Sequence, residues 1–392
     1  MNNFKYILSY FVLPLLMTFN TYAIFAYASE NEKNNQEETQ SRIPDLKAGK
    51  WEPIYSMGKN LFPSVVISTI TLKNGGDWDT ESNHLGENWG TIGIAVCSPK
   101  DNCSINVEIS SDTFIKPTTF IGTLPKKGIT YFIFPDLKYE YEKLLMVSQK
   151  IPEDLTFKVS IDRKADMDKT DHIQVRSINE CVYYFVDYDG NSVDTPWFFA
   201  AYVNENHPYI HRILADALKA QRVSSFSGTL GNIESQLEEI NAIWETLKKK
   251  GIRYSNITTT DDDENPELAT QYVRLIGQSI NYSQANCVDG SVLLASILRK
   301  IGFNVSLITV PGHMYIGLIF GTNEDSFICI ETTMIGNYTL EEAIEEGTND
   351  FTENESKFLS DSDEYYEYNI INIMDARAMG IISIKDSLSH QL

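Results

Sequence analysis

Residues 286–301 read NCVDGSVLLASILRKI, and this stretch decides how the second half of the chain is interpreted. Asn286 is a favourable N-cap, and Asp289 stands three residues later, as in a capping box. The residues between Asp289 and Gly302 are apolar on nearly every helical face, which is typical of a buried central helix. We therefore expect a buried helix whose first turn begins at Cys287.

Cys287 would occupy the first helical position, where unpaired N–H groups and the helix dipole favour a thiolate. A small buried cysteine with no chemical role fits the same position. The chain contains five cysteines, so at least one thiol has no partner within the chain. Cys97 and Cys103 flank a short loop and could form a small disulfide.

Three β-strand patterns follow this helix and carry the other candidate catalytic residues. FNVSLITV begins at Phe303, HMYIGLIF at His313 and SFICIET at Ser326. A hairpin centred on Thr322 would place His313 opposite Glu331, on the same face of the sheet.

Cys329 and Phe327 would share that face and pack under the helix that begins at Cys287. A thiol at a helix start, an imidazole and a carboxylate beside that imidazole correspond to the nucleophile, the base and the orienting group of cysteine catalysis. Cys287, His313 and Glu331 are therefore our candidate catalytic residues.

The order of these residues resembles the transglutaminase-like superfamily, a branch of the papain-like cysteine folds. The resemblance covers residues 251–336 and is carried mainly by NCVDGSVLLASILRKIGF, PGHMYIGL and FICIETTMIG. AYVNENHP and GIRYSNIT look like exported bacterial members in which a β-rich region precedes this domain. The resemblance implies acyl transfer from an amide through a thioester on Cys287, with His313 as base and Glu331 as third member. It implies no cofactor.

Two positions depart from the pattern of the family. Members usually have Asp where Glu331 stands, and enzymatic members often have an aromatic residue where Val288 follows the nucleophile. The donors to an oxyanion are therefore left open. The possible donors are the backbone N–H of Cys287 and the side chains of Gln278, Gln284 and Asn286.

The acceptor of the acyl group separates the functions that this site could have. Water as acceptor would give a peptidase or amidase, and an amine would give a protein-crosslinking acyltransferase. A member that has lost the chemistry would be a non-catalytic binding module. We expect a cysteine hydrolase that acts on amide bonds of a protein or peptide, because water needs no second binding site.

The chain before this domain has a different pattern. Residues 47–203 consist of short β-type runs and turn signals, which predict a β-sandwich domain. The expected strands are VVISTITL, TIGIAV, SINVEI, TYFIF, TFKVSI, HIQVRSI and CVYYFV. Helical spacing then predicts helices from Pro208, from Ile233, and from Asn265 to about Ile280. Residues 204–392 are accordingly expected to form a transglutaminase-like domain, and the fold class is α+β.

The first residues have the pattern of a targeting segment. Lys5, an apolar run and Ala26-Tyr27-Ala28 describe a secretory signal peptide over residues 1–28. The apolar stretch is also long enough for an uncleaved membrane anchor. Residues 29–46 are polar and predict a flexible linker. We expect a secreted or periplasmic protein.

Composition limits the partners. The 392 residues are 42% hydrophobic and carry a formal charge of -22, so the chain is a globular protein with little affinity for nucleic acids or anionic lipid.

His207 and His211 have helical metal-ligand spacing, but the acidic partner of a zincin is missing, and residues 261–264 are interpreted as a solvated acidic loop. No metal site is predicted. Residues 341–367 are acidic, and we expect a short helix followed by an acidic loop.

Overall fold

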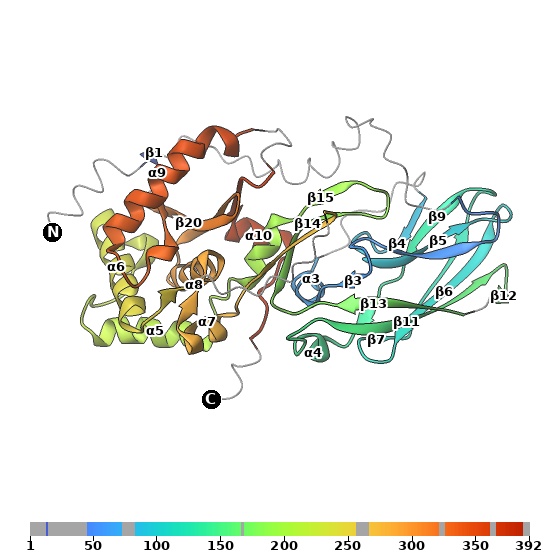
Figure 1. Ribbon diagram of the computed structural model, residues 1–392, viewed down its shortest axis with the longest axis horizontal. Helices are drawn as coiled ribbons and strands as arrows, with labels where there is room; N and C mark the ends of the chain where they lie inside the picture. Colours follow the sequence, from blue (N-terminus) through green and yellow to red (C-terminus); the bar gives the residue numbers. More distant parts are fainter. Residues whose placement is uncertain are drawn as a thin grey trace. The chain divides into compact units, whose positions relative to one another are not determined.

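The computed structural model describes residues 13–14, 45–72, 83–165, 168–255, 266–320, 326–360 and 366–386 (Figure 1). The chain forms two compact units. We call the described part of residues 33–195 and 262–271 the β-rich unit, and the described part of residues 1–32, 196–261 and 272–392 the α+β unit. Several sheets and helices occur together, so the chain is a mixed α+β protein, as the sequence predicts.

Two larger sheets form most of the β-rich unit, with strand orders β2-β5-β9-β4 and β3-β13-β11-β6-β8. Smaller sheets have the orders β10-β7 and β15-β14-β17, and β12 pairs with β11. The elements are β2 (Trp51–Tyr55), β3 (Asn60–Leu61), α3 (Pro63–Ser68), β4 (His84–Gly86), β5 (Ile92–Cys97), β6 (Cys103–Ser111), β7 (Ile115–Lys116), β8 (Thr118–Leu124), β9 (Thr130–Phe134), β10 (Lys138–Tyr139), α4 (Tyr141–Leu144), β11 (Ile151–Ile161), β12 (Lys164–Ala165), β13 (Lys169–Val175), β14 (Glu180–Val186), β15 (Ser192–Asp194) and β17 (Leu268–Tyr272).

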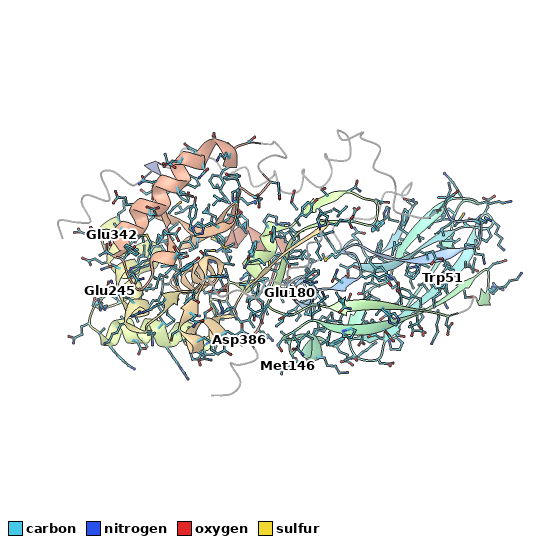
Figure 2. The ribbon with its side chains drawn as sticks, in the orientation of Figure 1. Trp51, Met146, Glu180, Glu245, Glu342 and Asp386 are labelled. Atoms are coloured by element: carbon cyan, nitrogen blue, oxygen red, sulfur yellow. The ribbon has the colours of Figure 1, made fainter. Side chains whose placement is uncertain are left out.

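Aromatic side chains join the two larger sheets. Trp51, labelled in Figure 2, lies on β2, and its ring centroid is 6.4 Å from that of Phe157 on β11. Tyr55 of the same strand meets Phe157 edge-on, at 6.5 Å. Trp51 and Phe157 are almost completely buried. The facing sides of the two sheets therefore share one apolar core, in which large aromatic side chains contribute much of the buried area.

Most of the predicted strands in this unit are confirmed, but VVISTITL is not a strand. Residues 63–68 form the helix α3, with Pro63 in its first turn and every side chain buried. A short apolar run without period cannot be assigned to a strand or a buried helix from its pattern alone. Cys97 and Cys103 are both buried free thiols in the structure, on β5 and β6, so the suggested disulfide is not formed.

The helix predicted from Asn265 to about Ile280 is also wrong. Its described part is divided into the strand β17 (Leu268–Tyr272) and the helix α7 (Ile276–Tyr282). β17 belongs largely to the β-rich unit, where it lies beside β14. The β-branched and aromatic residues of this stretch favour a strand once a neighbouring strand is available.

The α+β unit is built on one antiparallel sheet with the order β1-β21-β20-β19-β22. Its elements, with the 3-10 helices named η, are β1 (Leu13–Pro14), η2 (Pro196–Tyr202), α5 (Pro208–Lys219), η3 (Gly228–Leu230), α6 (Ile233–Lys249), β16 (Arg253–Tyr254), α7 (Ile276–Tyr282), β18 (Gln284–Ala285), α8 (Cys287–Lys300), β19 (Asn304–Val310), β20 (His313–Phe320), β21 (Ser326–Ile330), η4 (Thr332–Met334), α9 (Leu340–Phe358), β22 (Asn369–Asn372) and α10 (Ile373–Met379).

The helix α8 is the centre of this unit, as predicted. Every residue from Val288 to Leu298 is buried. The helix packs against β19 and β20 and also contacts α5 and α7. A helix surrounded by protein has few ways to shift, so its N-terminal residue has a fixed place in the fold.

The acidic stretch after residue 340 is one long helix, α9 (Leu340–Phe358), and not a short helix with a loop. Thr339 caps it through a capping box with Glu342. Leu340, Ile344 and Phe351 are buried, and the acidic residues on the other face are mostly exposed. The helical spacing of these apolar residues was hidden by the many intervening acids.

Most of the expected signal peptide and linker lies outside the described residues. Leu13 and Pro14 are described, and they pair with Phe327 and Ser326 at the edge of the sheet. Within the described part of the chain, no helix combines the length and the apolar character needed to span a bilayer.

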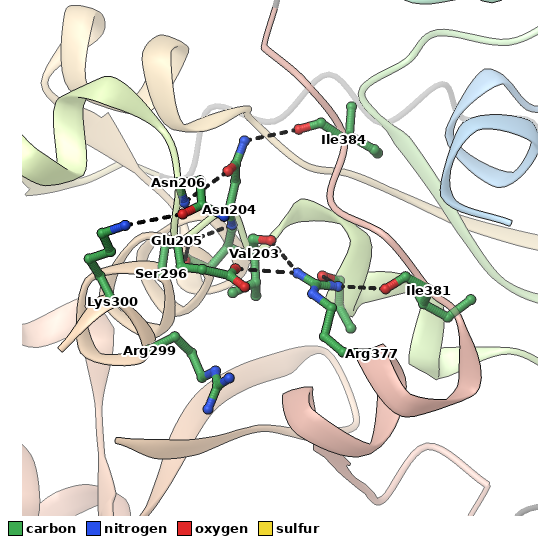
Figure 3. Close-up of polar contacts among 12 residues, drawn as sticks. Val203, Asn204, Glu205, Asn206, Ser296, Arg299, Lys300, Arg377, Ile381 and Ile384 are labelled. Atoms are coloured by element: carbon green, nitrogen blue, oxygen red, sulfur yellow. Dashed lines mark hydrogen bonds and ion pairs between the residues drawn. The ribbon is translucent and has the colours of Figure 1, made fainter. Parts of the chain in front are cut away.

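A half-buried arginine holds the connection between η2 and α5 to the C-terminal part of the unit (Figure 3). The Nη1 of Arg377 on α10 donates to the carbonyls of Ala200 and Ile381 at 3.1 and 3.0 Å, and Nη2 donates to that of Val203 at 2.6 Å. The Nη2 also lies 3.6 Å from Oε2 of Glu205. One guanidinium therefore donates to three backbone carbonyls, of which that of Ala200 also accepts from the N–H of Val203.

Removal of this guanidinium should weaken the α+β unit. Arg377→Met keeps the aliphatic stem but removes the donor to the three carbonyls and the cation paired with Glu205, so the free energy of unfolding should fall by about 2–3 kcal/mol. Urea unfolding monitored by circular dichroism measures the change. Lys300→Met is the matched control, because Lys300 makes one exposed bond to Asn206, and we expect a loss below about 0.5 kcal/mol. Equal effects of the two substitutions would contradict this role of Arg377.

Candidate active site

Cys287 is the first residue of α8, as the sequence predicts, and it is half-buried. The capping box forms in full. The side-chain Oδ1 of Asn286 accepts from the N–H of Asp289 at 2.8 Å, and Oδ2 of Asp289 accepts from the N–H of Asn286 at 3.1 Å. These two bonds fix the backbone on both sides of Cys287 and place its thiol at the positive end of the helix.

His313 and Glu331 are hydrogen-bonded, with 2.6 Å between Nε2 and Oε2. His313 opens β20, and Glu331 follows β21 as the N-cap of η4. The second carboxylate oxygen of Glu331 accepts from the N–H and the hydroxyl of Thr333, at 2.8 and 2.6 Å. The Glu331 carboxylate is therefore held on both oxygens, which fixes the plane in which it meets the imidazole.

The strand pairing differs from the predicted register by two residues. Ile316 faces Ile330 and Gly317 faces Cys329, so the hairpin is centred near residue 323 and not at Thr322. Residues 321–325, between the two strands in the sequence, lie outside the described residues. A shift of two residues keeps every side chain on its face, because side chains alternate along a strand. His313 and Glu331 are thus diagonal neighbours, a spacing that their long side chains can bridge.

The prediction that Cys329 and Phe327 pack under α8 is wrong. Both side chains pack in an apolar cluster with Phe351 of α9, and the ring centroids of Phe327 and Phe351 are 5.1 Å apart. The helix α9 was not predicted in full, so the sequence offered α8 as the only cover for this face. Burial raises the pKa of the Cys329 thiol well above its usual value, with a further contribution from Asp350. Cys329 is therefore a structural thiol.

Cys287, His313 and Glu331 come together as a connected set. The imidazole of His313 is hydrogen-bonded to Glu331 and also interacts electrostatically with the side chain of Cys287. Burial by itself would lower the pKa of His313, but the hydrogen bonds and negative charges of Cys287 and Glu331 raise it to about 10. Burial would raise the pKa of Glu331, but the bonds and charge of His313 and the bonds from Thr333 lower it below its usual value. At neutral pH the imidazole therefore carries its proton beside the ionised carboxylate of Glu331.

Buried hydroxyls lock the two halves of this set together. The hydroxyl of Thr332, the residue after Glu331, donates to the carbonyl of Cys287 at 3.3 Å and lies 2.9 Å from the hydroxyl of Ser291. Ser291 in turn bonds to the carbonyl of Met314 on β20. One hydrogen-bonded cluster therefore joins η4, which follows Glu331, to α8, which begins at Cys287, and to β20, which begins at His313.

Two of the possible side-chain donors to an oxyanion, Gln278 and Asn286, take part in hydrogen bonds at helix N-termini. The Oε1 of Gln278 accepts from the N–H of Leu275 at 2.9 Å, and Asn286 is buried in the capping box. Gln284 lies on β18 and is paired with Arg253 of β16.

Tyr254 is a residue of the site that the sequence analysis did not single out. It lies on β16 opposite Ala285, and its side chain is exposed. Partial burial raises its pKa, and the charges of Cys287 and Glu331 raise it further, which places its hydroxyl within electrostatic range of both. Its position within the quoted GIRYSNIT segment was a signal that could have drawn attention to it.

The other candidate sites are structural or lie outside the described residues. His207 caps α5, with Nδ1 accepting from the N–H of Tyr209 at 3.2 Å and Nε2 lying 3.3 Å from Oδ2 of Asp386, which is labelled in Figure 2. Residues 261–264 are not described. Among the residues that the structure describes, no cluster of His, Cys, Asp and Glu side chains could hold a metal ion.

Comparison with known proteins adds nothing to this geometry. No model of a protein family matches the chain, and no curated protein is significantly similar to it.

The carboxylate of Glu331 should control the pH range over which Cys287 reacts. Glu331→Gln keeps the size of the side chain but removes the charge that raises the pKa of His313, so the imidazole should lose its proton at a lower pH. Alkylation of Cys287 by iodoacetamide, followed by mass spectrometry across pH 5–10, should then require a higher pH than in the unmodified protein.

Glu345→Gln removes an exposed charge from α9 and should leave the profile unchanged. Cys329→Ser shows how much labelling comes from the second thiol. An identical pH profile in Glu331→Gln would mean that Glu331 is a structural cap of η4 only.

Proposed function

We propose that the chain is an exported transglutaminase-like cysteine hydrolase that cleaves amide bonds of a protein or peptide. The proposal includes a transglutaminase-like fold for the α+β unit and a β-sandwich for the β-rich unit. The observation that carries it is the pairing of His313 with Glu331 at 2.6 Å, together with the electrostatic interaction of the same imidazole with the thiol of Cys287. The export rests on the N-terminal residues, which have the pattern of a signal peptide.

Acylation would begin with the Cys287 thiolate. Its sulfur attacks the amide carbonyl carbon, so a C–S bond forms and the carbonyl oxygen takes the negative charge. His313 then gives its proton to the amide nitrogen, the C–N bond breaks, and the amine leaves. A pKa of His313 near 10 supports this role, because the proton needed by the leaving amine is already in place at neutral pH.

Deacylation would use the same histidine as a base. After the amine leaves, His313 is neutral and accepts a proton from water, which attacks the thioester carbonyl. The C–S bond breaks, the carboxylic acid is released, and the thiolate and imidazolium are restored. Glu331 stays ionised, orients the ring through Nε2 and stabilises the cation each time it forms.

Developing charge on the carbonyl oxygen needs a donor. The N–H of Cys287 belongs to the first helical turn and has no intrahelical acceptor, which supports it as one donor. The hydroxyl of Tyr254 is the side-chain donor that its electrostatic contact with Cys287 supports. This assignment goes beyond the glutamine and asparagine side chains considered from the sequence.

The proposed hydrolysis is tested with a peptide library and protein that lacks residues 1–28. We expect new carboxyl termini in the peptide products, identified by mass spectrometry, and no products from Cys287→Ala. Glu331→Gln should reduce the rate by about 10²–10⁴, as the loss of the third member does in other triads.

The alternatives give different products. Amine-linked peptides in place of free acids would identify a crosslinking acyltransferase. Retention of peptides without any covalent change, equal in the unmodified protein and in Cys287→Ala, would identify a binding module and contradict the proposal.

A further inference from the structure

A buried ion pair stands at the start of the nucleophile helix, and the proposed mechanism does not use it. The Nη1 of Arg274 lies 2.6 Å from Oδ2 of Asp289, and the two side chains are only 11% and 0% exposed. The backbone N–H of Arg274 donates to Oδ1 of Asp289 at 2.7 Å. With the N–H of Asn286 at 3.1 Å, three donors converge on one carboxylate.

This pair joins two elements at the point where the thiol emerges. Arg274 precedes α7, whereas Asp289 lies in the first turn of α8. A capping box needs only the bond from Asn286, so the two bonds from Arg274 are additional. They tie the first turn of α8 to the segment before α7 and thereby limit movement of the backbone at Cys287.

The pair also balances charge beside the thiol. Asp289 is the acidic residue in the first turn of α8, two positions after Cys287. Burial raises the pKa of the Asp289 carboxyl, whereas the backbone N–H groups of Asn286 and Arg274 and the guanidinium of Arg274 lower it. An uncompensated carboxylate at this place would oppose a thiolate, and an uncompensated guanidinium would favour one.

We propose that Arg274 and Asp289 are positioning residues for Cys287, which fix the first turn of α8 and cancel each other's charge beside the thiol. The inference deepens the proposed function and rests on it for its catalytic meaning. Burying two charged side chains costs free energy, and the attraction between them often fails to compensate for this cost. If Arg274 and Asp289 served stability alone, two apolar side chains would stabilise the fold equally well.

Single substitutions should move the reactivity of Cys287 in opposite directions. Arg274→Met leaves the Asp289 carboxylate without its cation, and the pH profile of alkylation should shift upward. Asp289→Asn leaves the Arg274 cation without its carboxylate, and the profile should shift downward. We expect each shift to be about one pH unit, equivalent to an about tenfold change in the rate at pH 6.

Charged and titratable groups from the neighbouring elements also face Cys287, and all of them are kept in these variants. They are His313 of β20, Glu331 at the start of η4 and Tyr254 of β16. The double variant Arg274→Met/Asp289→Asn should return the profile close to that of the unmodified protein, because no net charge is left beside the thiol.

Two further variants separate positioning from folding. Arg274→Lys keeps the charge and should keep the profile. Arg299→Met removes a half-buried arginine at the other end of α8, where Nη1 donates to the carbonyl of Phe303 at 3.0 Å, and it should lower stability without moving the profile. Hydrogen exchange of a peptide covering residues 284–292 should rise in Arg274→Met and stay unchanged in Arg299→Met.

The result that overturns the inference is a shift in the same direction, or no shift, for Arg274→Met and Asp289→Asn. If either variant fails to fold, an altered profile in Arg274→Lys overturns it equally. The proposed function fails independently, when the peptide library yields no cleaved product. If the two variants shift the alkylation profile in opposite directions but the library peptides are not cleaved, the positioning role is supported and only the proposed hydrolysis is refuted.

Discussion

The burial of α8 on all sides is the constraint on which the rest of the α+β unit depends. Residues 288–298 are enclosed by the sheet and by neighbouring helices, so the helix cannot rotate or slide without opening the core. The two ends of the helix are less buried than its middle, and Cys287 is the residue at the N-terminal end. The fold thus places one half-buried thiol at the positive end of a rigid helix dipole.

The groups around that thiol are held by short, mutually supporting contacts. Thr332 bonds to the carbonyl of Cys287, and its neighbour Glu331 bonds to His313, so the carboxylate and the nucleophile share a backbone anchor. His313 is protonated at neutral pH because the ionised carboxylate of Glu331 is hydrogen-bonded to it. The same anchors that stabilise the loop after β21 therefore set the charge state of the site.

The sequence predicts this site well because it lies on regular elements with strong local signals. The N-cap Asn286, the capping acid Asp289 and the all-round apolar helix predict the place of Cys287 correctly. The two-residue error in the hairpin register did not separate His313 from Glu331, because side chains repeat every two residues along a strand. The transglutaminase-like fold and the hydrolysis of amide bonds stay predictions.

The errors occur where tertiary partners decide local structure. Residues 63–68 are a short apolar run, and residues 268–272 are a short stretch with a β-branched and an aromatic residue. The state of both depends on what packs beside them. The first part of α9 was predicted as a short helix, but its continuation to Phe358 was not, because acids separate its buried residues. Tyr254 and Arg274 are distant from Cys287 in the sequence, and only the folded chain brings β16 and the segment before α7 to the start of α8.

The central claim is that His313 and Glu331 keep Cys287 as a reactive thiolate. The most direct measurement is the rate at which iodoacetamide labels each cysteine at a pH near 6. The folded protein is labelled first and then digested, and the labelled peptides are quantified by mass spectrometry. The account predicts rapid labelling of Cys287, with the buried Cys97, Cys103, Cys181 and Cys329 unlabelled. Labelling of Cys287 no faster than that of a free model thiol at the same pH would contradict it.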